Sequence, residues 1–161
     1  MSIVDETSSE TTSTRRTPAI YPRLAYSDER AALEYLQRVF GFTEIRESRM
    51  EWQGQILAWL RLGEGVVMIG HANHDVHHLY SPAEVGHATA MVNAEVADID
   101  AHYEHAVTEG ADITMEIEDA FYGYRRYEAT DLDGHRWHFT ESFDSIRARG
   151  GTVAEDIDED C

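Results

Sequence analysis

The densest group of side chains able to do chemistry is a run of histidines near the middle of the chain. His71, His74, Asp75, His77 and His78 fall within eight residues. Imidazole is the commonest metal ligand in proteins and changes charge near neutral pH. His74 and His78 would share one face of a helix, but the segment shows no helical periodicity. We interpret the run as a polar loop between two halves of the chain, with a metal site and a pH-sensitive lid as alternatives.

The composition excludes several kinds of chemistry and partner. The chain has no lysine, which rules out Schiff-base catalysis and a phosphate-binding P-loop, because both need a side-chain amine. Its one cysteine is the last residue, Cys161, so neither an intrachain disulfide nor a cysteine-based zinc site can form. The formal net charge of −18 disfavours nucleic acid and an anionic membrane surface as partners.

The same features indicate a location. No apolar stretch approaches the ~18 residues needed to cross a bilayer. The N-terminal region lacks the basic and apolar parts of a signal peptide. Together with the cysteine usage, these observations predict a cytoplasmic protein.

Both ends of the chain are polar. Residues 1–18 are rich in Ser and Thr, and residues 146–161 end in an acidic run. We expect two disordered tails, because neither segment carries enough apolar side chains to form a core. Residues 19–145 then form one domain, which is long enough to bury a core.

The domain contains an internal repeat. Asp28 and Asp98, each predicted to cap a helix, lie 70 residues apart, and Gly41 and Gly110, each predicted to follow a helix, lie 69 apart. One extended segment precedes each helix and three come after it, so each half is predicted to fold as β-α-β-β-β. The two predicted modules span residues 19–71 and 87–142, and residues 72–86 link them.

Two such modules side by side predict an α+β fold. We expect a cupped, mostly antiparallel eight-stranded sheet with the helices outside. The helices cover one face of the sheet, and the other face must be buried or must line a ligand site. The pattern therefore predicts a small-molecule cavity without saying what fills it.

The segment Asp131–Trp137 reads Asp-Leu-Asp-Gly-His-Arg-Trp. It resembles the Asp-Pro-Asp-Gly-His-x-Trp hairpin of the vicinal oxygen chelate superfamily, which includes glyoxalase I, extradiol dioxygenases, fosfomycin-resistance enzymes and bleomycin-binding proteins. Leu132 stands where the family usually has proline. The resemblance covers about residues 19–142 and implies the glyoxalase/bleomycin-resistance fold, which hosts many chemistries. Further segments similar to the family are Pro22–Leu24, Ser27–Asp28, Ala31–Tyr35, Val39–Phe42, Val96–Tyr103 and Glu109–Ala111.

The resemblance also implies where a metal would lie, because most enzymes of the superfamily hold a divalent ion with His, Gln or Glu side chains in the cavity. The corresponding positions here are occupied by Tyr21, Ile69, Met91 and His138. Only His138 is a good ligand for Zn, Ni or Mn. We therefore predict no metal and no cofactor, with a divalent metal as the alternative. A slip of one residue in strand register would bring in His71 or His87.

Alternation along the predicted strands extends the list of inward-facing residues and makes the cavity aromatic and mixed in charge. Glu95 and His138 are the residues predicted to act on a ligand, by hydrogen bonding or proton transfer. In the segment 121–127 either the odd-numbered or the even-numbered side chains face inward. The residues predicted to contact the ligand are Tyr21, Arg23, Ile69, Met91, Asn93, Tyr122, Tyr124 and Arg136.

These observations favour a metal-free binding protein that sequesters an aromatic or drug-like small molecule, as bleomycin-binding members of the resembled family do. The alternative is an enzyme of that superfamily: a metal-dependent lyase or dioxygenase, or a metal-free isomerase or lyase that uses Glu95 or His138 as a general base. The resemblance further implies a homodimer, in which a second copy would also cover open sheet edges.

Overall fold

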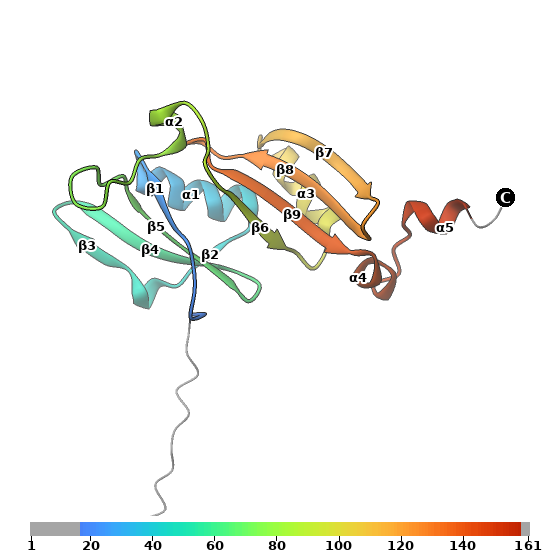
Figure 1. Ribbon diagram of the computed structural model, residues 1–161. Coiled ribbons are helices and arrows are strands. Elements are labelled where there is room, and N and C mark those ends of the chain that lie inside the picture. The colour runs from blue at the N-terminus through green and yellow to red at the C-terminus, as the bar shows by residue number, and fades with distance from the viewer. Residues whose placement is uncertain (1–16, 159–161) are drawn as a thin grey trace, which may run out of the picture.

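The structure, a computed structural model, describes residues 17–158 and contains both predicted modules (Figure 1). The first module consists of β1 (Arg23–Tyr26), α1 (Glu29–Phe40), β2 (Thr43–Glu44), the short 3₁₀ helix η1 (Arg46–Ser48), β3 (Met50–Trp52), β4 (Gln55–Leu62) and β5 (Gly65–His71). The linker contains α2 (Pro82–Val85). The second module and the segment after it consist of β6 (Met91–Glu95), α3 (Ile99–Thr108), β7 (Asp112–Ala120), β8 (Tyr124–Thr130), β9 (Arg136–Ser142), α4 (Phe143–Ala148) and α5 (Ala154–Asp158).

The two long helices begin where the repeat predicts. The carboxylate of Asp28 accepts a hydrogen bond from the amide of Ala31 in α1, and Asp98 accepts one from Ala101 in α3. Both predicted N-caps are confirmed. Gly41 ends α1 with φ of 73°, a left-handed conformation that glycine adopts without the cost a side chain would add.

The strands form two sheets that lie side by side, with α1 behind one and α3 behind the other (Figure 1). The first sheet has the order β1-β5-β4-β2, with β3 paired to β4, and the second has the order β6-β9-β8-β7. Within residues 17–158, the β1–β5 and β6–β9 pairs are parallel and the other strand pairs are antiparallel. The predicted α+β fold of two βαβββ modules is confirmed. Its strands pair within each module, as sheets of five and four strands, rather than as one sheet of eight.

One hydrophobic core joins the modules. The ring of Phe40, at the end of α1, packs against Trp137 and Phe139 of β9 with centroid distances of 5.8 and 5.0 Å. His102 of α3 reaches the same place, and its Nε2 lies 2.8 Å from the carbonyl oxygen of Phe40. Burial lowers the pKa of His102, so its neutral ring donates this hydrogen bond at neutral pH. The sheets are therefore held together through their helix-covered faces.

The Asp-Leu-Asp-Gly-His-Arg-Trp hairpin is a second joint between the modules. Asp131 is buried, and its Oδ2 accepts hydrogen bonds from the Tyr26 hydroxyl at 2.6 Å and from Nε1 of Trp137 at 3.0 Å. Its Oδ1 accepts from the amides of Asp133 and His135. Burial and then the Asp131 carboxylate raise the pKa of Tyr26 well above its ordinary value, so the hydroxyl stays a donor.

The same hairpin contacts β1 and the residue after it. Asp133 accepts hydrogen bonds from the amide and the hydroxyl of Ser27, and Nε2 of His135 lies 2.7 Å from the carbonyl oxygen of Ala25. The motif that carries the family resemblance therefore connects the second module to the first through hydrogen bonds.

The C-terminal segment is folded as far as residue 158, so the predicted start of a disordered tail at residue 146 is wrong. Val153 is 1% exposed between α4 and α5, and the amide of Ala154 donates to Asp119. Arg147 forms an ion pair with Asp156 at 2.9 Å. The acidic side chains from which a disordered tail was predicted are partly neutralised by such ion pairs. Of the tails predicted at 1–18 and 146–161, residues 1–16 and 159–161 lie outside the described part of the chain.

Candidate ligand-binding site

Cross-strand pairing distinguishes the helix-covered face of the first sheet from its open face. Leu24 of β1 pairs with Ile69 of β5, and both are buried in the core under α1. The prediction that Ile69 contacts a ligand is therefore wrong. Arg23 pairs with Met68, which makes Met68 the open-face residue at this level.

The error comes from unequal turns. In the first module Gly65 is already the first residue of β5, whereas in the second module Gly134 precedes β9 by two residues. Equal counts from the two glycines therefore end one residue out of step with the 70-residue repeat. A shift of one residue moves a side chain to the other face of a sheet.

The open face of the first sheet borders a cavity of about 310 Å³. Met50 and Trp52 of β3 are 58% and 74% exposed there, and Leu57 of β4 pairs with Met50. The loop after β5 adds Asn73 and His77 to the wall. This cavity thus has an apolar and aromatic side and a polar side, which is the usual make-up of a small-molecule site.

Arg23 brings a positive charge to this cavity. Its Nε is buried and has no hydrogen-bond partner within residues 17–158. Its Nη2 lies 3.6 Å from the point where a Cβ on Gly70 would stand, so the guanidinium lies across the bare backbone of β5. Buried donors in folded proteins are nearly always paired, and a ligand acceptor would pair this one.

Glu29 and His71 form a polar pair at the edge of the same cavity. Glu29 is the first residue of α1 and is only 6% exposed. One carboxylate oxygen accepts a hydrogen bond from the amide of Ile56 at 3.1 Å, and the other lies 3.1 Å from Nδ1 of His71. His71 is half-buried and lines the cavity. Sequence reasoning named His71 in the histidine run and in case of a register slip, but not as a base, and it missed Glu29, whose signal is an acidic residue directly after a helix cap.

On the open face of the second sheet, charged side chains neutralise one another. Glu128 of β8 accepts a hydrogen bond from Arg136 at 3.1 Å, and its other oxygen lies 3.3 Å from Nδ1 of His138. Asn93 pairs with His138 across β6 and β9, so Glu95, two residues further on, shares their face. Met91 pairs with Arg136, so the structure places all five predicted residues of β6 and β9 on one face, and their roles stay predictions.

Glu95 and Asn93 border a different cavity from the one beside Arg23. It has a volume of about 390 Å³ and lies between the modules, where β6 meets Phe42 and the start of β5. The predicted residues are thus distributed over separate places: Arg23 lies in the first module's cavity, and Asn93 and Glu95 lie in the groove between modules. The single cavity predicted from the cupped sheet is not formed by residues 17–158.

The remaining predicted residues lie near the surface. Tyr122 is 46% exposed in the β7–β8 turn, where its hydroxyl accepts a hydrogen bond from Arg126, and the ring of Tyr124 lies 6.0 Å away. In segment 121–127 the even-numbered residues 124 and 126 are therefore the open-face ones, since Tyr127 is buried in the core. Tyr21 is half-buried just before β1, and Met91 begins β6.

The donor set does not fit the divalent metal that the fold family implies. Correcting the register replaces Ile69 by Met68, so the four positions hold Tyr21, Met68, Met91 and His138. Neither thioether suits a hard or borderline ion, and Glu128 already contacts the one imidazole. Within residues 17–158 no three His, Cys, Asp or Glu side chains are grouped so that they could hold a metal.

The chain belongs to the Glyoxalase/Bleomycin resistance protein/Dioxygenase superfamily, whose family model matches residues 20–139. An uncharacterised protein of Mycobacterium tuberculosis H37Rv is 27% identical over 125 residues, which cover 74% of this chain and 72% of the relative.

Solved structures agree. TioX from Micromonospora sp. ML1 is 34% identical, with 76% of this chain and 94% of TioX covered and a TM-score of 0.62. A glyoxalase/bleomycin resistance protein/dioxygenase family enzyme from Burkholderia phytofirmans PsJN is 19% identical, with 74% and 94% covered and a TM-score of 0.58. The second likeness shows the fold alone, because sites differ between members of one fold.

Proposed function

We propose that this protein binds a planar aromatic or drug-like small molecule, without a metal, in the cavity of the first module. The observation that carries the proposal is the meeting of exposed Trp52 and Met50 with Arg23, whose Nε is buried and unpaired within the described residues. An aromatic ring can stack a planar ligand, and a guanidinium can pair with an anionic or carbonyl oxygen. The volume of about 310 Å³ suits a compound at the small end of the drug-like range.

Membership of the superfamily supports a small-molecule site, but the site itself must carry the choice of ligand. On the second sheet, Arg136 also has a buried Nε without a partner within residues 17–158, but Glu128 pairs with its Nη2 and contacts His138, so its charge is neutralised as that of Arg23 is not. No helix within residues 17–158 is long and apolar enough to span a membrane. The cytoplasmic location and the homodimer stay predictions.

Equilibrium dialysis with naphthalene-2-carboxylate, a planar aromatic anion, tests the proposal. We expect saturable binding that is unchanged by a chelator, and a loss of about tenfold in affinity for Trp52→Ala, since an aromatic pair contributes about 0.5–1.5 kcal/mol beyond its buried area. Arg23→Met should remove the preference for the carboxylate over its neutral methyl ester.

Phe121→Ala is the matched control, because Phe121 is an exposed aromatic residue in the other module's hairpin turn. It should bind as the wild type does. Absence of saturable binding up to about 1 mM, which corresponds to about −4 kcal/mol, would contradict the proposal, as would equal affinity of Trp52→Ala and the wild type.

A further inference from the structure

We propose that Glu29 and His71 make the first module's cavity a metal-independent proton-abstraction site for planar conjugated compounds that carry an acidic C–H. This inference rests on the proposed binding function of the same cavity and adds a reaction to it. His71 would be the catalytic residue, and Glu29 would be a positioning residue that acts through it.

The hydrogen bond between the two side chains determines which nitrogen of His71 is the base. A carboxylate has no hydrogen to donate, so the contact of 3.1 Å to Nδ1 places the proton on that nitrogen. Nε2 then keeps its lone pair and is the nitrogen that remains for a ligand. The ring is half-buried and borders the cavity, which gives a ligand access to it.

Glu29 is itself held in place. Its second oxygen accepts the amide hydrogen of Ile56, and its position at the start of the 12-residue helix α1 adds the positive end of the helix dipole. Both interactions hold the carboxylate in place and leave it few alternative orientations. The imidazole is thus oriented by a nearly buried carboxylate, the arrangement that general-base histidines use elsewhere.

Three other charged or titratable side chains border the cavity, and none of them shares the arrangement of His71. Arg23 lies across Gly70 on the open face of β5, whereas His71 shares the helix-covered face with Ile69, so the two side chains border the cavity from opposite faces of the strand. Glu51 also borders the cavity, but it is exposed and lies 3.8 Å from Arg49. His77 is a second imidazole on the wall, contributed by the loop after β5. The Glu29 contact distinguishes His71 from it.

The ring opening of 5-nitrobenzisoxazole is a suitable probe because it needs only a base and is balanced without an oxidant. The C–H proton moves to Nε2 of His71, and the C–H electron pair becomes the third carbon–nitrogen bond of a nitrile. The N–O bond breaks, and its electron pair stays on the oxygen as a coloured nitrophenolate. The imidazolium then returns its proton to water.

The experiment compares the rate per protein molecule with the rate per molecule of free imidazole at the same pH. We expect an excess of about 10²-fold, the low end for a positioned general base, and no effect of a chelator. His71→Gln should lower the rate to the imidazole level or below. His87→Gln is the matched control, an exposed histidine outside this cavity, and should leave the rate unchanged.

Glu29→Gln tests the positioning role. The amide oxygen can still accept the Ile56 hydrogen, so the fold should persist, but the NH₂ group then faces Nδ1 of His71 as a donor and favours the Nε2–H tautomer. We expect a rate at least tenfold lower, together with a shift of the His71 ¹⁵N resonances away from the Nδ1–H tautomer. Should this variant fail to fold, the tautomer of His71 in the wild type gives the same information: a ring protonated on Nε2 would overturn the inference.

Binding is measured separately, through quenching of tryptophan fluorescence by the nitro compound in the non-reacting His71→Gln variant. Saturable quenching without an excess rate in the wild type would overturn the proton-abstraction site and leave the binding function standing. Absence of saturable quenching would overturn both for this ligand class. A full rate in His71→Gln would also overturn the inference, because another group would then be the base.

Discussion

The two modules use the same position at the end of their last strands in different ways. His71 ends β5, and Glu141 stands 70 residues later in β9, the separation that relates the two halves of the chain. The His71 side chain is 37% exposed and borders a cavity, whereas the Glu141 side chain is 1% exposed. The scaffold is duplicated, but the environment of this position is not.

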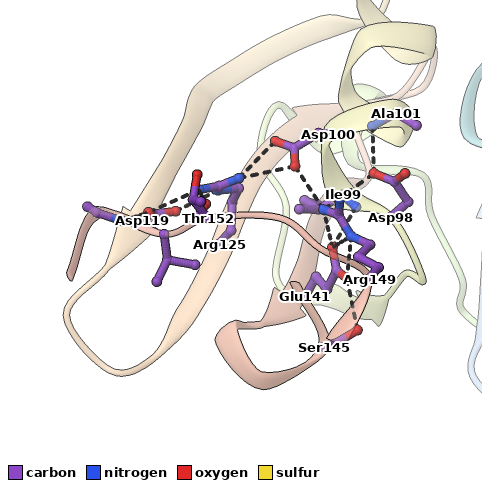
Figure 2. A network of polar contacts seen from close by, with 12 residues as sticks. Asp98, Ile99, Asp100, Ala101, Asp119, Arg125, Glu141, Ser145, Arg149 and Thr152 are labelled. Atoms are coloured by element: carbon purple, nitrogen blue, oxygen red, sulfur yellow. Dashed lines mark hydrogen bonds and ion pairs between the residues drawn. The ribbon is translucent and has the colours of Figure 1, made fainter. Parts of the chain in front are cut away.

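The environment of Glu141 is a closed polar network (Figure 2). Its Oε2 accepts hydrogen bonds from the amide of Ile99 and from Nη2 of Arg149, and its Oε1 accepts one from the hydroxyl of Ser145. Arg149 also reaches Asp100 at 2.8 Å. Burial raises the pKa of Glu141, but the hydrogen bonds from Arg149, Ile99 and Ser145 outweigh it, and the pKa is lowered overall.

The difference arises from the segment that comes after each strand. After β9 the chain turns directly into α4, which delivers Ser145 and then Arg149 to the buried carboxylate. After β5 the chain enters a loop that delivers Asn73 and His77, and no arginine. A repeated fold can thus seal a position in one copy and leave it open to a ligand in the other.

The largest effect is expected when the buried Glu141 loses its arginine partner. Arg149→Met leaves the carboxylate of Glu141 buried without its cation, and we expect a loss of about 3 kcal/mol in the free energy of unfolding. The thermal midpoint should fall by roughly 6–12 °C. Arg147→Met, on the same helix but paired with exposed carboxylates, should cost less than about 1 kcal/mol. Equal losses for the two variants in urea unfolding would contradict the comparison.

A smaller loss in the free energy of unfolding is expected when the Asp131–Trp137 hairpin, which connects the second module to the first, is changed. Asp131→Asn keeps one acceptor oxygen for the amides of Asp133 and His135 but turns an NH₂ group toward the Nε1–H of Trp137. An unpaired buried donor costs about 1–3 kcal/mol, so we expect a loss near 2 kcal/mol in urea unfolding. Asp144→Asn, on the exposed surface of α4, should change nothing measurable. If Asp131→Asn unfolded at the same urea concentration as the wild type, the contact between this hairpin and the first module would not be needed for stability.

Acid should weaken the sealed position selectively. The pKa of Glu141 is lower in the folded state than its ordinary value. Glu141 therefore contributes fully to the free energy of unfolding when the pH is above the ordinary pKa, and this contribution is lost as the pH falls through the folded-state pKa. Asp119, whose pKa is lowered chiefly by its hydrogen bond from Arg125, behaves in the same way. Urea unfolding between about pH 6 and 3 should show a smaller acid loss in Arg149→Met than in the wild type. Parallel curves would contradict this account.

The smallest effect is expected at the open position. His71→Gln removes a half-exposed ring, and the new amide can still donate a hydrogen bond to Glu29, so the cost in stability should stay below about 1 kcal/mol. Thermal unfolding of His71→Gln and Arg149→Met under the same conditions compares the two losses directly. A loss as large as that of Arg149→Met would mean that His71 serves the fold and not the cavity.

The fold was predictable because its signals are local. Asp28 and Asp98 cap their helices through contacts three residues along the chain, and the 70-residue repeat needs only their spacing. Ile69 was misplaced because the two β-hairpin turns differ in length, which a count from the glycines does not detect. The repeat interval itself, carried through to β5, would have selected Met68.

The candidate site was less predictable because its parts are distant in sequence. Glu29 and His71 lie 42 residues apart, and nothing local shows that a helix start and a strand end meet. The Asp131 hairpin was recognised by family resemblance, but its partner Tyr26 lies 105 residues away. The folded C-terminal segment was missed because its stability comes from ion pairs and two buried aliphatic side chains, Ile146 and Val153, which composition averages away.

The joint between the modules has a consequence for how the protein is made. The Tyr26–Asp131 hydrogen bond and the packing of Phe40 on Trp137 connect the first fifty residues to the last forty. At a synthesis rate of roughly 5–20 residues per second, β1 waits about 5–20 s for the hairpin that covers it. During that time the aromatic surface around Phe40 is bare on the nascent chain. The first module therefore lacks these contacts until β9 has left the ribosome, and the aromatic surface exposed until then is of the kind that promotes aggregation.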